Sequence, residues 1–236
     1  MTVIQKDDFI NSVANAFQFI SYYHPKDFVD AVYEAWQKET NPAAKNAMGQ
    51  ILVNSRMSAL GHRPICQDTG SAVVFVDIGM NVQWNTDMTV EEMVNEGVRL
   101  AYNNPDNPLR ASILVDPIGK RQNTKDNTPA VVHISMVKGD KVDVTCAAKG
   151  GGSENKSKFA MLNPSDSIEE WILKTIPAMG AGWCPPGVLG IGVGGTPEKA
   201  MLLAKRSLMD EINIHELQAK ADSGVALNSV ERLRLN

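Results

Sequence analysis

Apolar positions in the first third of the chain recur at the spacing of an α-helix. The large apolar side chains of segment 26–40 share one helical face and are Phe28, Val29, Val32, Tyr33 and Trp36. Asn41 followed by Pro42 is typical of an N-cap with proline at the first helical position, and Gly61 should end that next helix. The pattern therefore predicts an N-terminal helical part.

From about residue 72 the pattern changes to that of strands. Residues 72–78 form a dense run of β-branched and apolar side chains, which predicts a strand buried on both faces. Residues 131–137 and 142–148 also have strand patterns. Gly139-Asp140 between them is a plausible two-residue turn, so we expect a hairpin here.

Later helices are indicated by the residues that begin them. Thr89 with Glu92, and Ser167 with Glu170, have the spacing of a capping box. Thr196 before Pro197 opens a further helix to about residue 208. The whole mixture predicts an α/β or α+β fold, a single mixed domain over residues 1–236 with an N-terminal helical part and strands from about 72 onward.

Two segments do not fit this regular pattern. Residues 103–128 are rich in Asn, Asp and Pro and lack sustained periodicity. A stretch of this length inside a compact domain is either functional or disordered. The tail from residue 215 is polar and weakly patterned, so no element is predicted there.

Composition and charge exclude several classes of protein. Hydrophobic residues make up 43% of the chain and charged residues 21%, and the net charge of -4 gives no general reason to bind nucleic acid or an anionic membrane. No apolar run approaches the roughly 20 residues of a membrane span, and the acidic N-terminus is unlike a signal peptide. We expect a cytoplasmic protein whose Cys66, Cys146 and Cys184 are structural, reactive or metal-binding rather than disulfide-bonded.

A first candidate site is the loop Pro64–Gly70, with the sequence Pro-Ile-Cys-Gln-Asp-Thr-Gly. It places a thiol, an amide, a carboxylate and a hydroxyl side by side before the predicted buried strand. This set suits a metal or substrate site, with a thiolate for a metal and a carboxylate for proton transfer. The alternative is a tight turn in which Asp68 and Thr69 bind nearby backbone amides and Cys66 is inert.

Two glycine-rich loops are further candidates. Residues 149–156 place three glycines between lysines, which favours an anion. Because the P-loop spacing is missing, a substrate carboxylate is a better candidate than a nucleotide phosphate, and the alternative is a flexible surface loop. Residues 180–187 contain Cys184 before two prolines, a setting found in cluster-binding loops and equally in rigid turns. The glycines of 192–197 favour a close-packed turn over an anion site.

Other metal and nucleophile patterns are missing from the sequence. His215-Glu216 is not followed by a histidine at position 219, which excludes a zincin, and no G-x-S-x-G motif occurs. Cys66 and Cys184 are too far apart along the chain for a local zinc-binding motif. Distant loops could still assemble a metal or a cluster from them.

Taken together, these loops resemble one family, the iron–sulfur (class I) fumarases and the related L-tartrate dehydratases. The matching parts follow one another in the family's order: Pro64–Gly70, Leu109-Arg110, Lys149–Lys156 and Cys184-Pro185-Pro186. The resemblance covers about residues 29–208, and it identifies the chain as an N-terminal, alpha-type cluster-binding domain.

The resemblance implies a hydro-lyase with a [4Fe-4S] cluster acting as Lewis acid on a small dicarboxylate. By position, Cys66 and Cys184 match cluster ligands, and Asp68 matches a catalytic group that gives a proton to the leaving hydroxyl. Gln67, Arg110 and Gly152 match substrate-binding residues, and the arginine fork suits a carboxylate. The expected reaction is the reversible dehydration of (S)-malate to fumarate.

The resemblance also implies parts that these residues do not supply. The third cysteine ligand, the base for the carbon-bound proton and a second domain or subunit are expected beyond Asn236. Cys146 does not match the missing ligand and is expected to be a structural thiol near the site. We further expect a homodimer, and little activity from this chain alone. The alternatives are an L-tartrate dehydratase alpha-type domain and a folded but catalytically silent assembly module.

Overall fold

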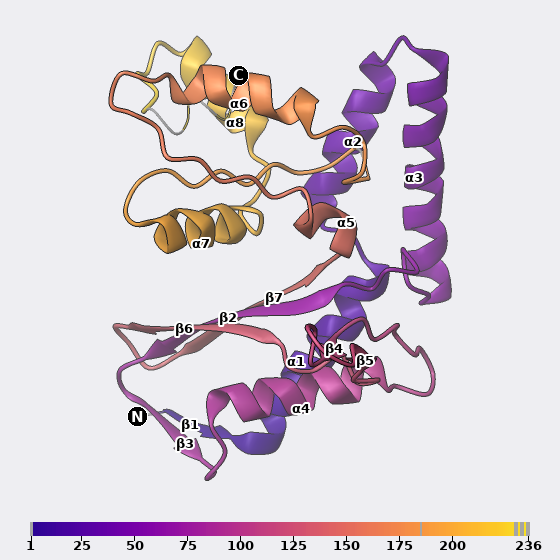
Figure 1. Ribbon diagram of the computed structural model, residues 1–236, viewed down its shortest axis with the longest axis vertical. Coiled ribbons are helices and arrows are strands. Elements are labelled where there is room, and N and C mark those ends of the chain that lie inside the picture. The colour runs from indigo at the N-terminus through magenta and orange to yellow at the C-terminus, as the bar shows by residue number, and fades with distance from the viewer. Residues whose placement is uncertain (1, 185, 229–230, 232–233, 235–236) are drawn as a thin grey trace. The chain divides into compact units, whose positions relative to one another are not determined.

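The computed structural model describes residues 2–184, 186–228, 231 and 234 (Figure 1). The fold is mixed α/β, as the sequence predicts. The chain divides into two compact units, described separately here: unit 1 contains residues 2–24 and 49–154, and unit 2 contains residues 25–48 and the described residues from 155 onward. None of the helices in the described ranges has the length and apolar character that a membrane crossing needs.

Unit 1 contains the strands and four of the structure's helical segments, one of them the end of α3. In chain order its elements are β1 (Thr2–Gln5), α1 (Lys6–Tyr22), the end of α3 (Pro42–Gly61), β2 (Ser71–Gly79), β3 (Val82–Asn85), α4 (Val90–Tyr102), β4 (Leu114–Val115), β5 (Gln122–Asn123), β6 (Val131–Val137), β7 (Val142–Lys149) and the short α5 (Gly151–Glu154). β1 pairs with β3 in parallel, and β4 pairs with β5 in an antiparallel ladder.

β2 is the middle strand of the main sheet, whose order is β6-β2-β7. Residues Ala72–Val76 are buried without interruption, which confirms the prediction of a strand covered on both faces. Its even-numbered apolar side chains face a core shared with α1 and α4. Among the odd-numbered side chains of β2, Phe75 stacks on His133 of β6, with ring centroids 4.9 Å apart.

The predicted hairpin of residues 131–148 is wrong. β6 runs parallel to β2 and β7 antiparallel to it, so the two strands flank β2 and do not pair with each other. Their connection crosses the end of β2, where the Gly79 amide donates to the Lys141 carbonyl oxygen at 2.8 Å. A side chain on Gly79 would collide with the Gly139 backbone. The buried apolar run of β2 needs partners on both edges, and this outcompetes a local turn.

Unit 2 contains helices and connecting segments. Its elements are α2 (Lys26–Lys38), the start of α3, α6 (Ile168–Ala178), α7 (Pro197–Ser207) and α8 (Ile214–Asp222). Residues 188–193 form no strand. Gly190 and Gly192 lie so close to α7 that a side chain on either would collide with a backbone carbonyl of that helix. This agrees with the close-packed turn expected at 192–197.

Most predicted helix starts are confirmed by their caps. Asn41 Oδ1 accepts from the Ala43 and Ala44 amides at 2.9 and 3.2 Å, and α3 ends at Gly61. Thr89 and Glu92 form the complete capping box of α4. At α6, Ser167 Oγ accepts from the Glu170 amide, the half of the box that the structure shows.

Several short elements were missed from the sequence, β1 and α8 among them. β1 has only four residues and owes its pairing to β3, which lies far along the chain. α8 buries only Leu217 among its residues, so no apolar stripe marks it. It is held within unit 2 by His215, whose Nε2 lies 2.8 Å from Glu34 Oε1 of α2.

Helices α1 and α4 pack closely together at Gly97. A Cβ atom there would lie 2.7 Å from Val13 Cβ and 2.8 Å from the Ile10 carbonyl oxygen. Val13 and the α4 residue Val98 are fully buried beside this contact. The missing side chain at 97 therefore sets the distance between the two helices.

We expect Gly97→Ala to lower the free energy of unfolding by about 1–3 kcal/mol, because the added methyl group forces the two helices apart. Chemical denaturation followed by circular dichroism measures this. Gly61→Ala is the matched control, since its Cβ would meet only Arg63 Cγ at 3.7 Å. Equal stability of the two variants would contradict the close packing of α1 against α4.

Candidate functional site

Three loops meet at one end of the main sheet in unit 1. β2 begins at Ser71, opposite Lys149 where β7 ends, and Val73 lies opposite Val131 where β6 begins. The Pro64–Gly70 loop, the segment 103–130 and the Gly150–Gly152 turn therefore all leave the sheet at this end, near β4 and β5 (Figure 1). Segments that are far apart in the sequence are brought together by strand pairing.

Asp68 joins the first loop to the glycine turn. Its Oδ2 accepts a hydrogen bond from the Gly151 amide at 2.9 Å, and its Oδ1 accepts from the Gly70 amide at 3.1 Å. A Cβ on Gly150 would lie 3.3 Å from Asp68 Oδ2, which is tighter than an ordinary contact. Glycine at 150 therefore allows the carboxylate to approach the backbone of the turn.

Cys66 and Gln67 lie exposed on the same loop, and hydrogen bonds to α1 and α3 hold the backbone of the preceding residue, Ile65. The Cys66 thiol lies 3.4 Å from Gln67 Oε1 and can donate to it. The Ile65 amide donates to the Ser21 carbonyl of α1 at 2.8 Å, and Asn54 Nδ2 donates to the Ile65 carbonyl at 2.8 Å. An accessible thiol on a fixed backbone is suited to binding a metal.

The backbone of Arg110 is hydrogen-bonded to this loop. The Thr69 hydroxyl donates to the Arg110 carbonyl oxygen at 2.9 Å. The preceding Leu109 is buried in the core, and its amide donates to the Tyr102 carbonyl at 3.1 Å. The Arg110 side chain itself is exposed. The structure thus places Cys66, Gln67, Asp68, Arg110 and the turn containing Gly152 around one end of the sheet.

Two buried side chains that hold these loops were not found from the sequence. The Tyr102 hydroxyl lies 2.8 Å from the Thr69 carbonyl and 2.9 Å from the Gly70 carbonyl. Burial raises the pKa of this phenol well above its usual range, so Tyr102 acts as a hydrogen-bond donor. Asn127 Nδ2 donates to the same Gly70 carbonyl at 3.0 Å. The helix pattern could have shown that Tyr102 is buried, but nothing in the irregular segment marks Asn127.

Cys146 lies outside this group of exposed side chains. It is half-buried on β7 opposite Val74 and packs against the core. Burial raises the pKa of the Cys146 thiol to about 12, which disfavours the thiolate that a metal needs. This environment supports the expectation of a structural thiol.

Cys184 belongs to unit 2, whereas Cys66 belongs to unit 1. Cys184 is exposed and has a positive φ of 63°, and its amide donates to the Ala181 carbonyl at 3.1 Å. Pro185 of the Cys-Pro-Pro motif lies outside the described residues. In the part of the chain that the structure describes, no three His, Cys, Asp or Glu side chains gather as a metal site. A cysteine thiol is the side chain that ligates iron–sulfur clusters, and each of these two thiols is exposed.

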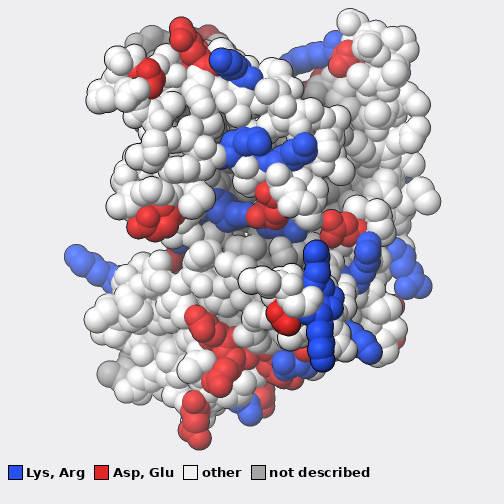
Figure 2. All heavy atoms as spheres, in the orientation of Figure 1, with Lys and Arg blue, Asp and Glu red and all other residues white. Residues whose placement is uncertain are grey.

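Positive charge is concentrated in the segment that contains Arg110. Between residues 109 and 125 the sequence has four basic residues and one acidic residue, Asp116. The Asp116 carboxylate accepts from the Gly119 and Lys120 amides. Figure 2 shows Lys and Arg side chains gathered over the region of β4 and β5, and acidic side chains over α4. This segment is therefore favourable for an anionic ligand.

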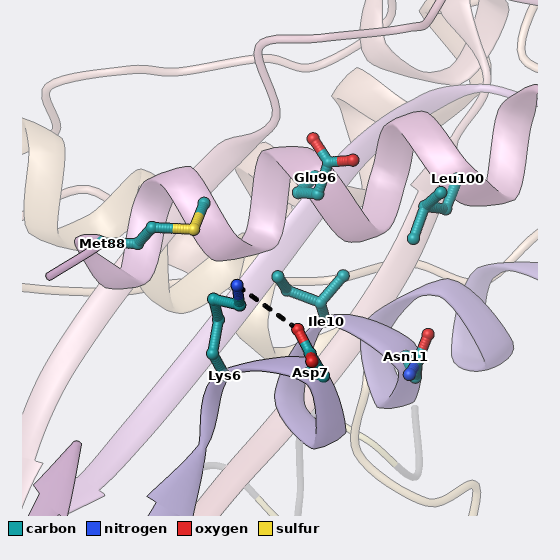
Figure 3. Close-up of a pocket in the computed structure, with 7 residues that line it drawn as sticks. All are labelled: Lys6, Asp7, Ile10, Asn11, Met88, Glu96 and Leu100. Atoms are coloured by element: carbon teal, nitrogen blue, oxygen red, sulfur yellow. Dashed lines mark ion pairs between the residues drawn. The ribbon is translucent and has the colours of Figure 1, made fainter. Parts of the chain in front are cut away.

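A surface hollow elsewhere in unit 1 does not contain any of the predicted site residues. It measures about 520 Å³ and is lined by residues of α1, of α4 and of the turn before α4. Figure 3 shows Lys6 and Asp7 among the lining residues, joined by an ion pair. Lys6 Nζ lies 3.5 Å from Asp7 Oδ1. Its lining offers neither a thiol nor an arginine.

Comparisons with known proteins show the family to which the chain belongs. The family model described as Fumarate hydratase (Fumerase) matches residues 10–232. A Methanocaldococcus jannaschii protein, provisionally named as an L(+)-tartrate dehydratase subunit alpha, is 36% identical over 208 residues, which is 85% of this chain and 72% of that protein.

Two Escherichia coli K12 proteins are also similar. The anaerobic class I fumarate hydratase is 33% identical over 172 residues, and the match covers 69% of this chain but only 31% of that protein. The L(+)-tartrate dehydratase subunit alpha is 26% identical over 216 residues, covering 89% of this chain and 69% of that protein. The chain belongs to the fumarate hydratase (Fumerase) family.

Proposed function

We propose that this chain is the alpha-type, cluster-binding part of a hydro-lyase that reversibly dehydrates (S)-malate to fumarate. The observation that carries the proposal is the convergence of Asp68 and Arg110 on one end of the sheet, joined through Thr69 and Gly70. A carboxylate for proton transfer and an arginine for a substrate carboxylate are the two groups that this reaction needs from the chain.

Each side chain has a role that its position supports. Arg110 is exposed in a basic segment and binds one substrate carboxylate with its planar fork. Asp68 gives a proton to the leaving hydroxyl, which departs as water. Gln67 and the Gly152 backbone contact the substrate. The base that takes the carbon-bound proton is proposed to come from a partner subunit or a second domain.

We also propose that Cys66 and Cys184 are ligands of a [4Fe-4S] cluster, with the third cysteine supplied by a partner subunit or second domain. When bound, such a cluster supplies a Lewis-acidic iron that makes the substrate hydroxyl a better leaving group. Cys146 is not proposed as a ligand, because its burial disfavours the thiolate.

L(+)-tartrate is the second candidate substrate. The relatives named as tartrate dehydratase alpha subunits match this chain over 72% and 69% of their lengths, whereas the match with the fumarate hydratase covers 31% of that protein. The two dicarboxylates differ by one hydroxyl, and a few side chains can decide between them. The names of these relatives also favour a second subunit as partner.

The activity test uses the chain reconstituted anaerobically with iron and sulfide, together with its partner subunit. We expect fumarate to form from (S)-malate, and Arg110→Lys to raise KM about tenfold or more because the bidentate contact is lost. Oxaloacetate formation from L(+)-tartrate at a higher kcat/KM would favour the second candidate. A reconstituted complex that acts on neither dicarboxylate would support the silent assembly module instead.

The ligand assignment predicts which cysteine substitutions remove iron. We expect Cys66→Ser and Cys184→Ser to lose bound iron and the broad visible absorption of the cluster, because each loses a thiolate ligand. Cys146→Ser is the matched control and should keep both. If Cys146→Ser loses iron while Cys66→Ser retains it, the assignment is wrong.

The environments of the thiols also predict their reactivity in the metal-free chain. At pH 8 we expect iodoacetamide to modify the exposed Cys66 and Cys184 much faster than Cys146, because the raised pKa leaves almost no thiolate at residue 146. Peptide mapping by mass spectrometry measures each rate. The rate at Cys146 should rise as the pH approaches 12. Modification of Cys146 as fast as Cys66 at pH 8 would contradict the burial described for β7.

A further inference from the structure

The segment around Arg110 is irregular, yet its backbone is fixed at every residue from 109 to 113. The Leu109 amide bonds to Tyr102, and the Arg110 carbonyl accepts from Thr69. Asn123 Nδ2 donates to the Ala111 carbonyl, and the Ser112 amide donates to Asn127 Oδ1. The Thr124 amide donates to the Ile113 carbonyl. The segment is held mostly by side chains rather than by a strand ladder.

Two contacts in this set reach the Pro64–Gly70 loop: the Thr69 hydroxyl bonds to the Arg110 carbonyl, and Asn127 links Ser112 to Gly70. Asn127 belongs to neither segment and bonds to both. Its Oδ1 accepts from the Ser112 amide at 2.7 Å, and its Nδ2 donates to the Gly70 carbonyl at 3.0 Å. The side chain is completely buried. An amide that donates at one end and accepts at the other ties two backbone segments together, and both bonds are strengthened by the lack of competing water.

The Gly70 carbonyl receives Asn127 on one lone pair and the Tyr102 hydroxyl on the other. Gly70 has a positive φ of 76°, and a Cβ there would lie 2.6 Å from the Lys149 nitrogen. On its amide side, Gly70 donates to Asp68, whose second oxygen accepts from Gly151. The hydrogen bonds therefore run without a break from Ser112 through Asn127 and Gly70 to Asp68 and the glycine turn.

We propose that Asn127 is a positioning residue, whose bridge between Ser112 and Gly70 fixes the position of Arg110 relative to Asp68. The functional half of this inference rests on the proposed dicarboxylate site. Asn127 touches no substrate. It acts through the backbone of Ser112 and Gly70, which it ties together on either side of the site.

The test variant is Asn127→Gly. Asn127 has a positive φ of 62°, a backbone conformation that glycine adopts without strain, so the substitution removes the amide bridge and leaves the backbone conformation accessible. Gly97→Ala is the control for lost stability, because it loosens the contact between α1 and α4 without touching the bridge. Tyr102→Phe removes the other donor to Gly70 and leaves the Ser112 contact in place.

The structural half is measured by hydrogen exchange on the chain by itself. We expect Asn127→Gly to speed amide exchange at least tenfold in both 109–113 and 68–70, whereas Tyr102→Phe affects 68–70 and Gly97→Ala affects neither selectively. If both segments exchange at the wild-type rate, the proposal that Asn127 bridges them is wrong, whatever the activity of the variant.

The functional half is measured on the complex with its partner. We expect Asn127→Gly to raise KM for (S)-malate about ten- to hundredfold, and to have no further effect on KM when Arg110 is already alanine. Gly97→Ala should keep the wild-type KM. An unchanged KM, or effects that multiply in the double variant, would overturn the positioning role. If the wild-type complex acts on no dicarboxylate, the proposed function fails, and the exchange data still decide whether the bridge exists.

Discussion

The structure of unit 1 depends on one constraint: β2 must be buried on both faces and paired on both edges. Its run of valines would lose about 1.5–3 kcal/mol for each side chain left in water. Helices α1 and α4 cover one face, and β6 and β7 occupy the two edges. Because β6 and β7 run in opposite directions, the loop before β2, the loop before β6 and the turn after β7 all reach the same end of the sheet.

This placement turns three separate loops into one candidate site. The interior strand fixes where each loop begins, and side-chain hydrogen bonds then fix the rest. Asp68 binds the backbone of the glycine turn, and Thr69 binds the backbone of Arg110. Loops are where function is usually found, because a rigid scaffold can present them without constraining their sequence. Two buried donors, Tyr102 and Asn127, bond to backbone carbonyls of the Pro64–Gly70 loop and hold it in place.

Much of this arrangement could be predicted from local sequence, and the rest could not for a physical reason. The buried strand 72–78, the Asn41 cap and the Thr89 capping box depend on residues close in sequence, and all three are confirmed. The hairpin at 131–148 was wrong because strand pairing is decided by partners far along the chain. Asn127 was missed for the same reason: its two contacts, Ser112 and Gly70, have no common pattern in the sequence.

The family resemblance identified Cys66, Gln67, Asp68, Arg110 and Gly152 as candidates, and the structure adds how unit 1 brings their loops to one end of the sheet. Their roles can be tested together by hydrogen exchange on the anaerobically assembled enzyme, with and without a saturating dicarboxylate that cannot react, such as succinate. The account predicts simultaneous protection of residues 66–70, 109–113 and 149–152, with the rest of unit 1 unchanged. Protection confined to other segments, or to only one of these three loops, would contradict the claim that they form a single dicarboxylate site.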